Sequence, residues 1–193
     1  MDILILDGGP RDGRGQACRS INDRVVRGAR QRGWNVTAFG LDGMAIKPCV
    51  GCFACWLKHP GTCAIKDDEA AIHRAMAKSD ISVWITPVTF GGYSPALKKA
   101  LDRSIPIALP YFIRVQGEIH HPLRYPKRLG LMVFGTLASP CEEAERIFHR
   151  LVQRNGLNLG SSMTESRILY DGADGDGIDS LVEGMLRAAE EAR

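Results

Sequence analysis

The chain has 193 residues, of which 45% are hydrophobic and 24% are charged, an ordinary balance for one globular domain with a sizeable core. The formal net charge of +3 is too small to indicate a nucleic-acid-binding protein, and no stretch approaches the ~18 consecutive apolar residues that span a membrane. The first residues carry no export signal, so the clustered cysteines are expected to be reduced or metal-bound in the cytoplasm.

The first half of the chain alternates strand and helix patterns. Ile3–Leu6 is a continuous apolar run, which predicts a strand buried on both faces. A glycine-rich loop and a helix of about fifteen residues follow, from near Ala17 to Gly33. Residues 34–39 alternate apolar and polar side chains, which is typical of an edge strand. The acidic run 67–69 then begins a helix, because acids in a first turn favour the positive end of its dipole.

The second half repeats this alternation. Three further apolar runs are predicted strands: Asp80–Thr86, Leu129–Phe134 and Ser166–Tyr170. Ser94 is the expected N-cap of a helix that begins at Pro95. Ser139–Glu142 reads as a capping box before a helix that buries Ile147, and a last helix begins near Ile178.

Five strand–helix units predict an α/β fold with an open five-stranded parallel sheet, helices on both faces and the strand order 2-1-3-4-5. We expect residues 1–193 to form a single domain. Within it, residues 105–127 carry four prolines and fit no regular period. A loop of this length is usually functional, so we expect this excursion to be a lid or an oligomer interface.

Ligands bind such sheets beyond the carboxyl ends of strands 1 and 3, where the strand order reverses. The loop 8–18 lies before a helix N-terminus and resembles neither a dinucleotide fingerprint nor a P-loop, so a phosphate monoester with Arg11 and Arg14 fits best. The alternative is a glycine-rich turn with solvated arginines. The loop 87–93 offers main-chain groups and an apolar wall to a flat heterocycle, unless Phe90 is only a packing residue.

The cysteine loop, read as C-x2-C-x2-C-x7-C, follows the second strand, and we expect it to meet the other two loops at one rim. Its four candidate ligands are Cys49, Cys52, Cys55 and Cys63. This spacing is typical of a 4Fe–4S cluster, while a zinc ion and free thiols remain alternatives. Gly51 leaves room for the chain to turn around a cluster, and Lys58 and His59 would offset its negative charge. The remaining Cys18 and Cys141 read as small buried hydrophobes.

Four segments together resemble the flavodoxin-like NAD(P)H-dependent FMN reductases and, within them, the iron–sulfur flavoproteins: GGPR, PCVGCFACW with its later cysteine, TPVTFGGYSPALKKALDR and GEIHHPLRYPKR. The resemblance covers about residues 1–170 and implies a three-layer flavodoxin-like fold that binds FMN. It implies one set of residues around the FMN phosphate: Gly9, Pro10, Arg11, Gly15, Gln16 and Ala17. It implies a second set facing the isoalloxazine ring: Pro87, Val88, Thr89, Phe90, Gly91 and Gly92.

The expected function is that of an FMN-dependent oxidoreductase that takes electrons from NAD(P)H or a ferredoxin-like donor. The alternatives are a non-enzymatic electron-transfer flavoprotein and an FMN-binding regulatory module. No catalytic side chain is singled out; His120 and His121 are either a proton donor beside the flavin or a structural pair. The apolar residues 111–113 predict that the excursion packs against a second copy, in a homodimer or homotetramer.

Overall fold

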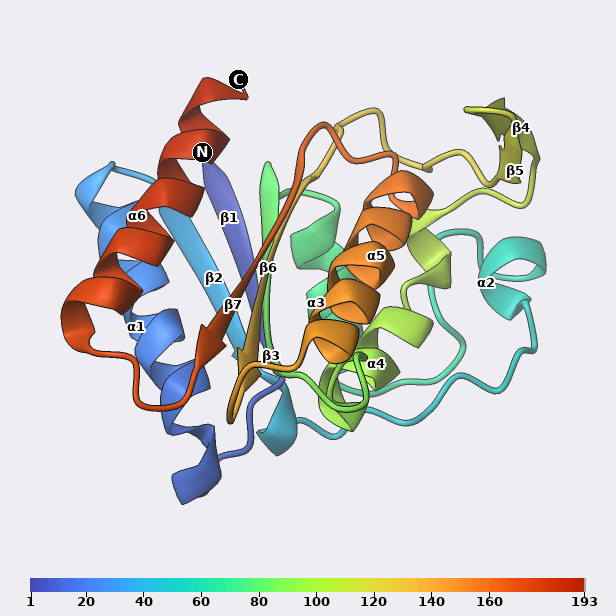
Figure 1. Ribbon diagram of the computed structural model, residues 1–193. Coiled ribbons are helices and arrows are strands. Elements are labelled where there is room, and N and C mark those ends of the chain that lie inside the picture. The colour runs from blue at the N-terminus through green and yellow to red at the C-terminus, as the bar shows by residue number, and fades with distance from the viewer. Residues whose placement is uncertain (193) are drawn as a thin grey trace.

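A computed structural model describes residues 1–192 of the chain. Five parallel strands form one sheet in the order β2-β1-β3-β6-β7 (Figure 1). Their bounds are Asp2–Asp7 for β1, Asn35–Gly40 for β2, Ile81–Pro87 for β3, Gly130–Leu137 for β6 and Thr164–Tyr170 for β7. Ile5 of β1 lies between Ala38 and Val83 of its two neighbours, so the strand order reverses beside β1, as the fold prediction requires.

The predicted strand order 2-1-3-4-5 is wrong in its last two numbers, because the excursion contains two strands that were not predicted. β4 (Ile113–Val115) and β5 (Glu118–His120) form a separate antiparallel hairpin, so the last two strands of the main sheet are the sixth and seventh along the chain. Gln116 and Gly117 turn the hairpin with φ values of 51° and 84°. Strands of three residues carry too little alternation to be recognised in a sequence, and Gln-Gly is not one of the dipeptides that signal such a turn.

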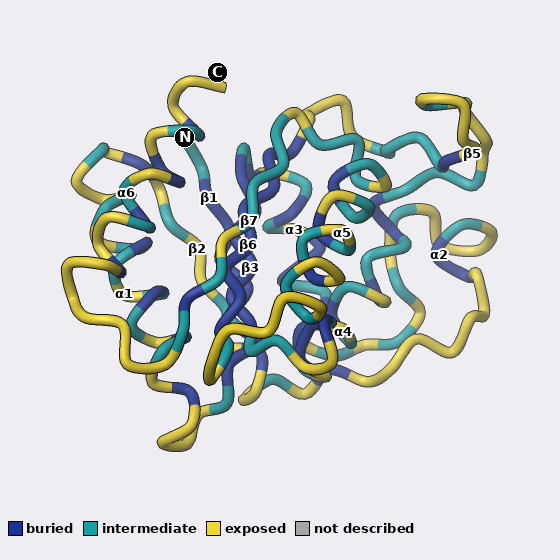
Figure 2. The backbone as a smooth tube through the Cα atoms, in the orientation of Figure 1, coloured by how far each residue is buried: buried dark blue, intermediate teal, exposed yellow. Residues whose placement is uncertain are grey.

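Helices cover both faces of the sheet (Figure 1). α1 (Gln16–Gln31) and α6 (Gly175–Glu191) pack on one face, and α3 (Glu69–Met76), α4 (Pro95–Asp102) and α5 (Glu142–Asn158) pack on the other. Three short 3₁₀ turns complete the chain: η1 (Gly13–Gly15), η2 (Leu41–Gly43) and η3 (Ile105–Ile107). The central strands are buried on both faces (Figure 2), which explains their continuous apolar sequences. In residues 1–192, no helix is both long and apolar enough to cross a lipid bilayer.

Several predicted helix ends are confirmed and two details are wrong. Ser94 caps α4 by accepting the N–H of Leu97 at 3.3 Å. The capping box at Ser139 does not form, because α5 begins only at Glu142 and Glu145 accepts the N–H of Cys141 at 2.9 Å.

The other wrong detail on α5 is the burial of Ile147, which is 38% exposed. The burial of Phe148 and Val152, predicted for the same helix, is confirmed.

The two remaining cysteines have different surroundings. Cys18 is 2% exposed in the core between α1 and the sheet, which confirms its prediction as a buried hydrophobe. Cys141 is exposed, contrary to prediction, because it is the N-cap residue that precedes α5 rather than part of its buried face.

The base of the excursion is closed by an isolated bridge between Ala108 and Leu123. Its outer part, together with the short helix α2 (Ala54–Leu57), stands away from the sheet beyond the α3–α5 layer (Figure 1). Large apolar side chains are exposed there: Tyr111, Phe112, Ile113 and Ile119. His120 is 8% exposed and Nδ1 of its ring lies 3.1 Å from Oδ1 of Asn158, so it is a structural residue of the excursion.

Candidate functional site

The loops after β1 and β3 meet at the carboxyl edge of the sheet. The N–H of Gly8 donates to the carbonyl of Ile85 at 2.8 Å, and the Ser94 hydroxyl donates to the carbonyl of Gly8 at the same distance. A Cβ atom on Gly8 would come within 2.6 Å of that hydroxyl oxygen. The backbone of the first loop therefore packs directly on the start of α4, which confirms that these two loops converge.

The loop after β1 forms a tight cradle before α1. A Cβ atom added to Gly15 would lie 1.8 Å from the carbonyl oxygen of Pro10. A Cβ atom added to Gly9 would lie 2.5 Å from Cβ of Cys18. Only glycine fits at these two positions. α1 then begins at Gln16 with no side-chain cap and no acidic residue in its first turn. Its first N–H groups and its dipole are therefore available to an anion.

Asp7, at the end of β1, supports this cradle by accepting the N–H of Gly9 at 2.8 Å. Burial raises the pKa of the Asp7 carboxyl, although the Gly9 hydrogen bond and the charge of Arg19 oppose the shift. The sequence pattern did not single out Asp7 or Arg19. The guanidinium of Arg19 donates to the carbonyls of Pro10 and Asp12, at 3.2 and 2.8 Å. Arg19 therefore braces the turn of the loop.

The two arginines expected to face a phosphate lie elsewhere. The guanidinium of Arg11 lies over Gly43 of η2 and donates to the carbonyl of Gly40 at 3.4 Å. The backbone N–H of Arg11 donates to the carboxylate of Asp42 at 3.0 Å. Arg14 pairs with Asp12 at 2.6 Å on the surface. The positive potential of the cradle therefore comes mainly from the backbone of α1, and Arg11 ties this loop to the chain after β2.

The loop after β3 ends in a tight turn. Thr89 and Gly92 exchange N–H···O hydrogen bonds of 3.0 and 2.8 Å, and Phe90 and Gly91 between them have φ values of 49° and 76°. Two successive left-handed residues make a type I′ turn. The Phe90 side chain at its tip is 98% exposed and is not a packing residue, whereas Tyr93 is buried edge-on against two other aromatic rings.

Two further groups reach this edge, one near the end of β6 and one in the loop after β7, and the sequence pattern identified neither. The hydroxyl of Thr136, in β6, lies 3.6 Å from the sulfur of Cys18. A cavity of about 390 Å³ also opens between the first turn of α1 and the loop after β7, where Tyr170 and Asp171 line it with Gln16. The position of Thr136 near the carboxyl end of a central strand could have indicated the first of these groups.

The four clustered cysteines line one cavity: Cys49, Cys52, Cys55 and Cys63, together with Arg103, Ile105 and Pro106. Left-handed φ values of 66° at Gly51 and 51° at Phe53 turn the backbone around it. Burial raises the pKa of the Cys55 thiol, and the charges of the other three thiols raise it further. The four sulfur atoms are therefore close enough to interact electrostatically.

Arg103, which ends α4, is the central side chain of this region and was not singled out in the sequence. Its guanidinium is 1% exposed and donates to the carbonyl of Lys47 at 2.6 Å, to Asp67 at 2.9 Å and to the sulfur of Cys63 at 3.4 Å. Asp67 therefore compensates a buried arginine and also accepts the first N–H of α3, from Glu69, at 3.3 Å.

The indole of Trp56 joins the cysteine loop to the excursion. Its N–H lies 3.3 Å from the carbonyl of Ile105 and 3.0 Å from that of Ala108. The ring also stacks on Phe53 and packs at a tilt against His121, with centroids 5.3 and 4.8 Å apart. The cysteine loop is thus fixed against the excursion on one side and against Arg103 on the other.

The sequence analysis predicted that all three loops meet at one rim, and this prediction is wrong for the cysteine loop. Only the start of the segment after β2, at Asp42, contacts the cradle. The cysteines lie beside Arg103 at the far end of α4, and eight helical residues span about 12 Å. In residues 1–192, no three His, Cys, Asp or Glu side chains are grouped closely enough to hold a single metal ion.

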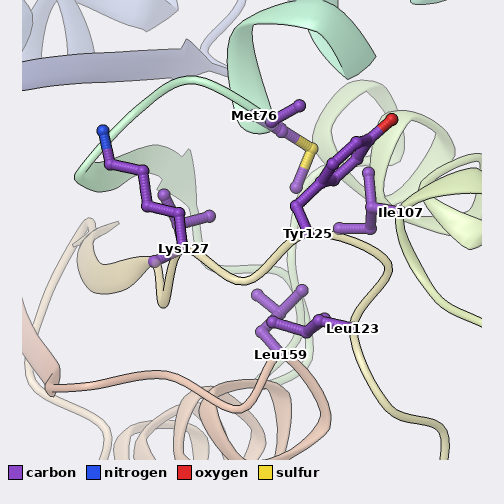
Figure 3. A pocket seen from close by; sticks show the side chains of 8 residues that line it. Met76, Ile107, Leu123, Tyr125, Lys127 and Leu159 are labelled. Atoms are coloured by element: carbon purple, nitrogen blue, oxygen red, sulfur yellow. The ribbon is translucent and has the colours of Figure 1, made fainter.

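A small apolar cavity lies at the opposite edge of the sheet (Figure 3). Leu123 and Tyr125 of the excursion, with Met76 and Leu159, line it. Its position shows how the excursion packs on the α3–α5 layer, and none of the candidate site residues borders it.

Comparison with known proteins agrees with this geometry. An iron–sulfur flavoprotein of Methanosarcina thermophila is 31% identical over 105 residues, which are 54% of this chain and 53% of that protein. A second iron–sulfur flavoprotein, from Methanocaldococcus jannaschii, is 30% identical over 114 residues, 59% of this chain and 57% of the relative. The matches therefore span about half the length of these relatives.

Solved structures share the fold over the whole chain. The NAD(P)H:quinone oxidoreductase of Methanothermobacter marburgensis has a TM-score of 0.68 at 17% identity and covers all of this chain and 98% of its own. General stress protein 14 of Treponema denticola, solved with FMN, has a TM-score of 0.61 at 15% identity and full coverage of both chains. The family model described as NADPH-dependent FMN reductase matches residues 1–116, more than half of the sequence, and the chain belongs to that family.

Proposed function

We propose that the protein is an FMN-dependent oxidoreductase in which a 4Fe–4S cluster, held by Cys49, Cys52, Cys55 and Cys63, exchanges electrons with the flavin. NAD(P)H or a ferredoxin-like protein is the proposed donor. The observation that carries this proposal is the cavity lined by all four cysteines in a chain of the FMN reductase family. The names of the archaeal relatives, which are iron–sulfur flavoproteins, support it.

The cradle after β1 fits a phosphate monoester. Its two constrained glycines, Gly9 and Gly15, leave no side chain between an incoming anion and the first N–H groups of α1. Gln16 and Ala17 supply the first of these N–H groups. No acidic residue in the first turn opposes a dianion. This is the chemistry that the phosphate of FMN requires.

The loop after β3 fits a flat ring beside that phosphate. Val88 is anchored to β6 through its N–H, which donates to the carbonyl of Thr136 at 2.9 Å. The turn that follows leaves Phe90 exposed above the sheet edge, where its ring can cover a heterocycle and exclude water. The backbone of residues 87–92 is the proposed source of hydrogen bonds to the ring edge.

The spacing of the four cysteines favours a cluster over a zinc ion, because structural zinc sites usually join two separated C-x2-C pairs. A cluster takes thiolates from several sides, and all four cysteines border one cavity. Bound FMN supplies hydride acceptance and single-electron transfer, and a cluster supplies single-electron transfer. Arg103 would donate to Cys63 and stabilise negative charge added there.

Anaerobic purification tests the proposal directly. We expect brown protein with about four irons per chain and an FMN absorption spectrum. Serine at Cys49, Cys52, Cys55 or Cys63 should sharply reduce the iron content. Cys18→Ser and Cys141→Ser are matched controls and should retain it. Yellow protein that stays free of iron after anaerobic reconstitution, with all four thiols titratable, would reject the cluster and leave the flavin assignment standing.

Turnover separates the enzyme from its alternatives. Oxidation of NADPH with a quinone acceptor is the expected activity, since a solved neighbour is an NAD(P)H:quinone oxidoreductase. An electron carrier would exchange electrons with a protein partner and show little NADPH turnover. A regulatory module would bind FMN and turn over no donor.

We also propose that the excursion packs against a second copy of the chain, in a homodimer or homotetramer. The side chains of Tyr111, Phe112 and Ile119 are 67%, 72% and 68% exposed, which is more contiguous apolar surface than a monomer usually leaves in water. Light scattering at micromolar concentration should return a multiple of 21.1 kDa. A monomer mass would contradict the proposal.

A further inference from the structure

Cys63 borders a second cavity besides the one that it shares with the other three cysteines. This second cavity has a volume of about 320 Å³, within the range of small-ligand sites. We call it the basic cavity. The residues that define its chemistry are Lys66, His73, Arg74, Lys78 and Tyr125, and Cys63 lies at its border.

The basic cavity concentrates uncompensated positive charge. Lys66, Arg74 and Lys78 form no ion pair with any carboxylate in residues 1–192, and none of the lining residues is acidic. The nearby Asp67 and Asp80 are already paired, with Arg103 and Lys127, and the buried Glu69 carboxylate lies 3.4 Å from Nε2 of His73.

These cations do not all come from one element. Arg74 lies in the last turn of α3, where the helix dipole favours a cation, and Lys78 follows two residues after the helix ends. Lys66 enters from the loop before α3, so the helix end alone does not explain the cluster. A bound anion would relieve the repulsion between all three.

The walls of the cavity are fixed. His73 is 8% exposed and its Nε2 atom lies 2.8 Å from the carbonyl of Arg103, which holds the imidazole in place. The ring of Tyr125 separates the basic cavity from the apolar cavity, and Figure 3 shows its hydroxyl directed away from Leu123 and Leu159. An added Cβ at Gly61, which also lines the basic cavity, would lie 3.7 Å from that hydroxyl oxygen.

We propose that the basic cavity binds a small molecule with two or more phosphate or carboxylate groups, beside the cysteine site. Three cationic side chains and a phenol are the donors that such groups need. The binding itself is independent of any metal. Cys63 borders both cavities, so the bound molecule would lie beside the cysteine site. The statement that this neighbouring site carries electrons rests on the proposed function.

Calorimetry with two probes tests this site. Inorganic pyrophosphate and succinate are titrated separately into protein at low ionic strength, with FMN in excess to fill the cradle before α1. We expect one saturable site per chain for at least one probe, and the two arms show whether phosphate or carboxylate is preferred. Absence of saturable binding for both probes would overturn the proposal.

Charge reversal locates the site. Lys66→Glu and Arg74→Glu should each weaken binding at least tenfold, because each turns an attraction into a repulsion. The matched control is Arg150→Glu on α5, an exposed arginine without an ion pair among the described residues, which should change binding less than twofold. Equal losses in all three variants would mean that the probe senses only the overall charge, and would overturn the proposal.

A cysteine variant separates this inference from the proposed function. Cys63→Ser should lose iron but retain probe binding, since every cation of the basic cavity remains. Loss of iron with intact binding supports both statements. A protein that never holds iron but still binds pyrophosphate through Lys66 and Arg74 would reject the cluster and support the basic cavity.

Discussion

Replacing Arg103 with methionine tests whether a buried ion pair holds the cysteine loop. The side chains of Arg103 and Asp67 are 1% and 5% exposed. Without the guanidinium, the Asp67 carboxylate stays buried with only the N–H groups of Lys47 and Glu69, at 3.0 and 3.3 Å. Breaking a buried pair from one side costs about 3–5 kcal/mol. For a domain of this size, such a loss corresponds to a fall in melting temperature of about 6–20 °C.

Urea denaturation at pH 7, followed by tryptophan fluorescence, measures this loss. The matched control Arg150→Met removes an exposed arginine and should change stability by less than about 0.5 kcal/mol. Adding Asp67→Asn to Arg103→Met should recover at least about 1 kcal/mol, because it removes the uncompensated charge. An Arg103→Met variant within about 1 kcal/mol of wild type would refute the ion-pair reasoning.

The pH dependence supplies an independent check. Burial alone would raise the pKa of Asp67, but the hydrogen bonds from Arg103 and from the N–H of Lys47 outweigh it and hold the pKa below its usual range. A folded-state pKa below the unfolded value of about 3.9 adds stability above that value, which is lost as the pH falls through the folded pKa. In Arg103→Met the carboxyl protonates more readily. The stability difference from wild type should therefore be smaller at pH 4 than at pH 7.

Three further variants test the rim of the sheet. Gly15→Ala should weaken FMN at least tenfold in a fluorescence titration, because the added Cβ collides with the carbonyl of Pro10 and reshapes the cradle; unchanged affinity would contradict the phosphate site. Phe90→Asn creates the Asn-Gly pair that type I′ turns prefer, and the exposed Phe90 ring loses no burial when it is removed. The free energy of unfolding in urea should therefore rise by about 1 kcal/mol, and a fall would contradict the turn. Tyr93→Phe removes the hydroxyl that accepts from Asn155 at 2.9 Å and should cost about 1 kcal/mol by the same assay, whereas no change would show that this bond contributes nothing.

The sheet and its two rim loops could be predicted from the sequence because local patterns determine them. Buried parallel strands need continuous apolar runs such as Ile3–Leu6, and Ser94-Pro95 marks a helix start by its own chemistry. Glycines crowded between strand and helix, such as Gly15, mark the cradle for the same reason.

The surroundings of the cysteines could not be predicted in this way. Arg103 reaches Cys63 and Asp67 across 40 and 36 residues, and no local pattern encodes such a contact. Arg11 has the right position for a phosphate in sequence, but its guanidinium donates to the carbonyl of Gly40 and lies over Gly43 instead. In both cases the deciding partner lies on another segment of the chain.

The hydrogen bonds of Trp56 have a consequence for how the protein is made. Its indole donates to carbonyls that lie 49 and 52 residues further along the chain. Ribosomes add about 5–20 residues per second, so the four thiols of the loop are synthesised several seconds before the segment that shapes them. During that interval these two hydrogen bonds cannot form. The contact that fixes Trp56 therefore waits for the synthesis of the first residues of the excursion.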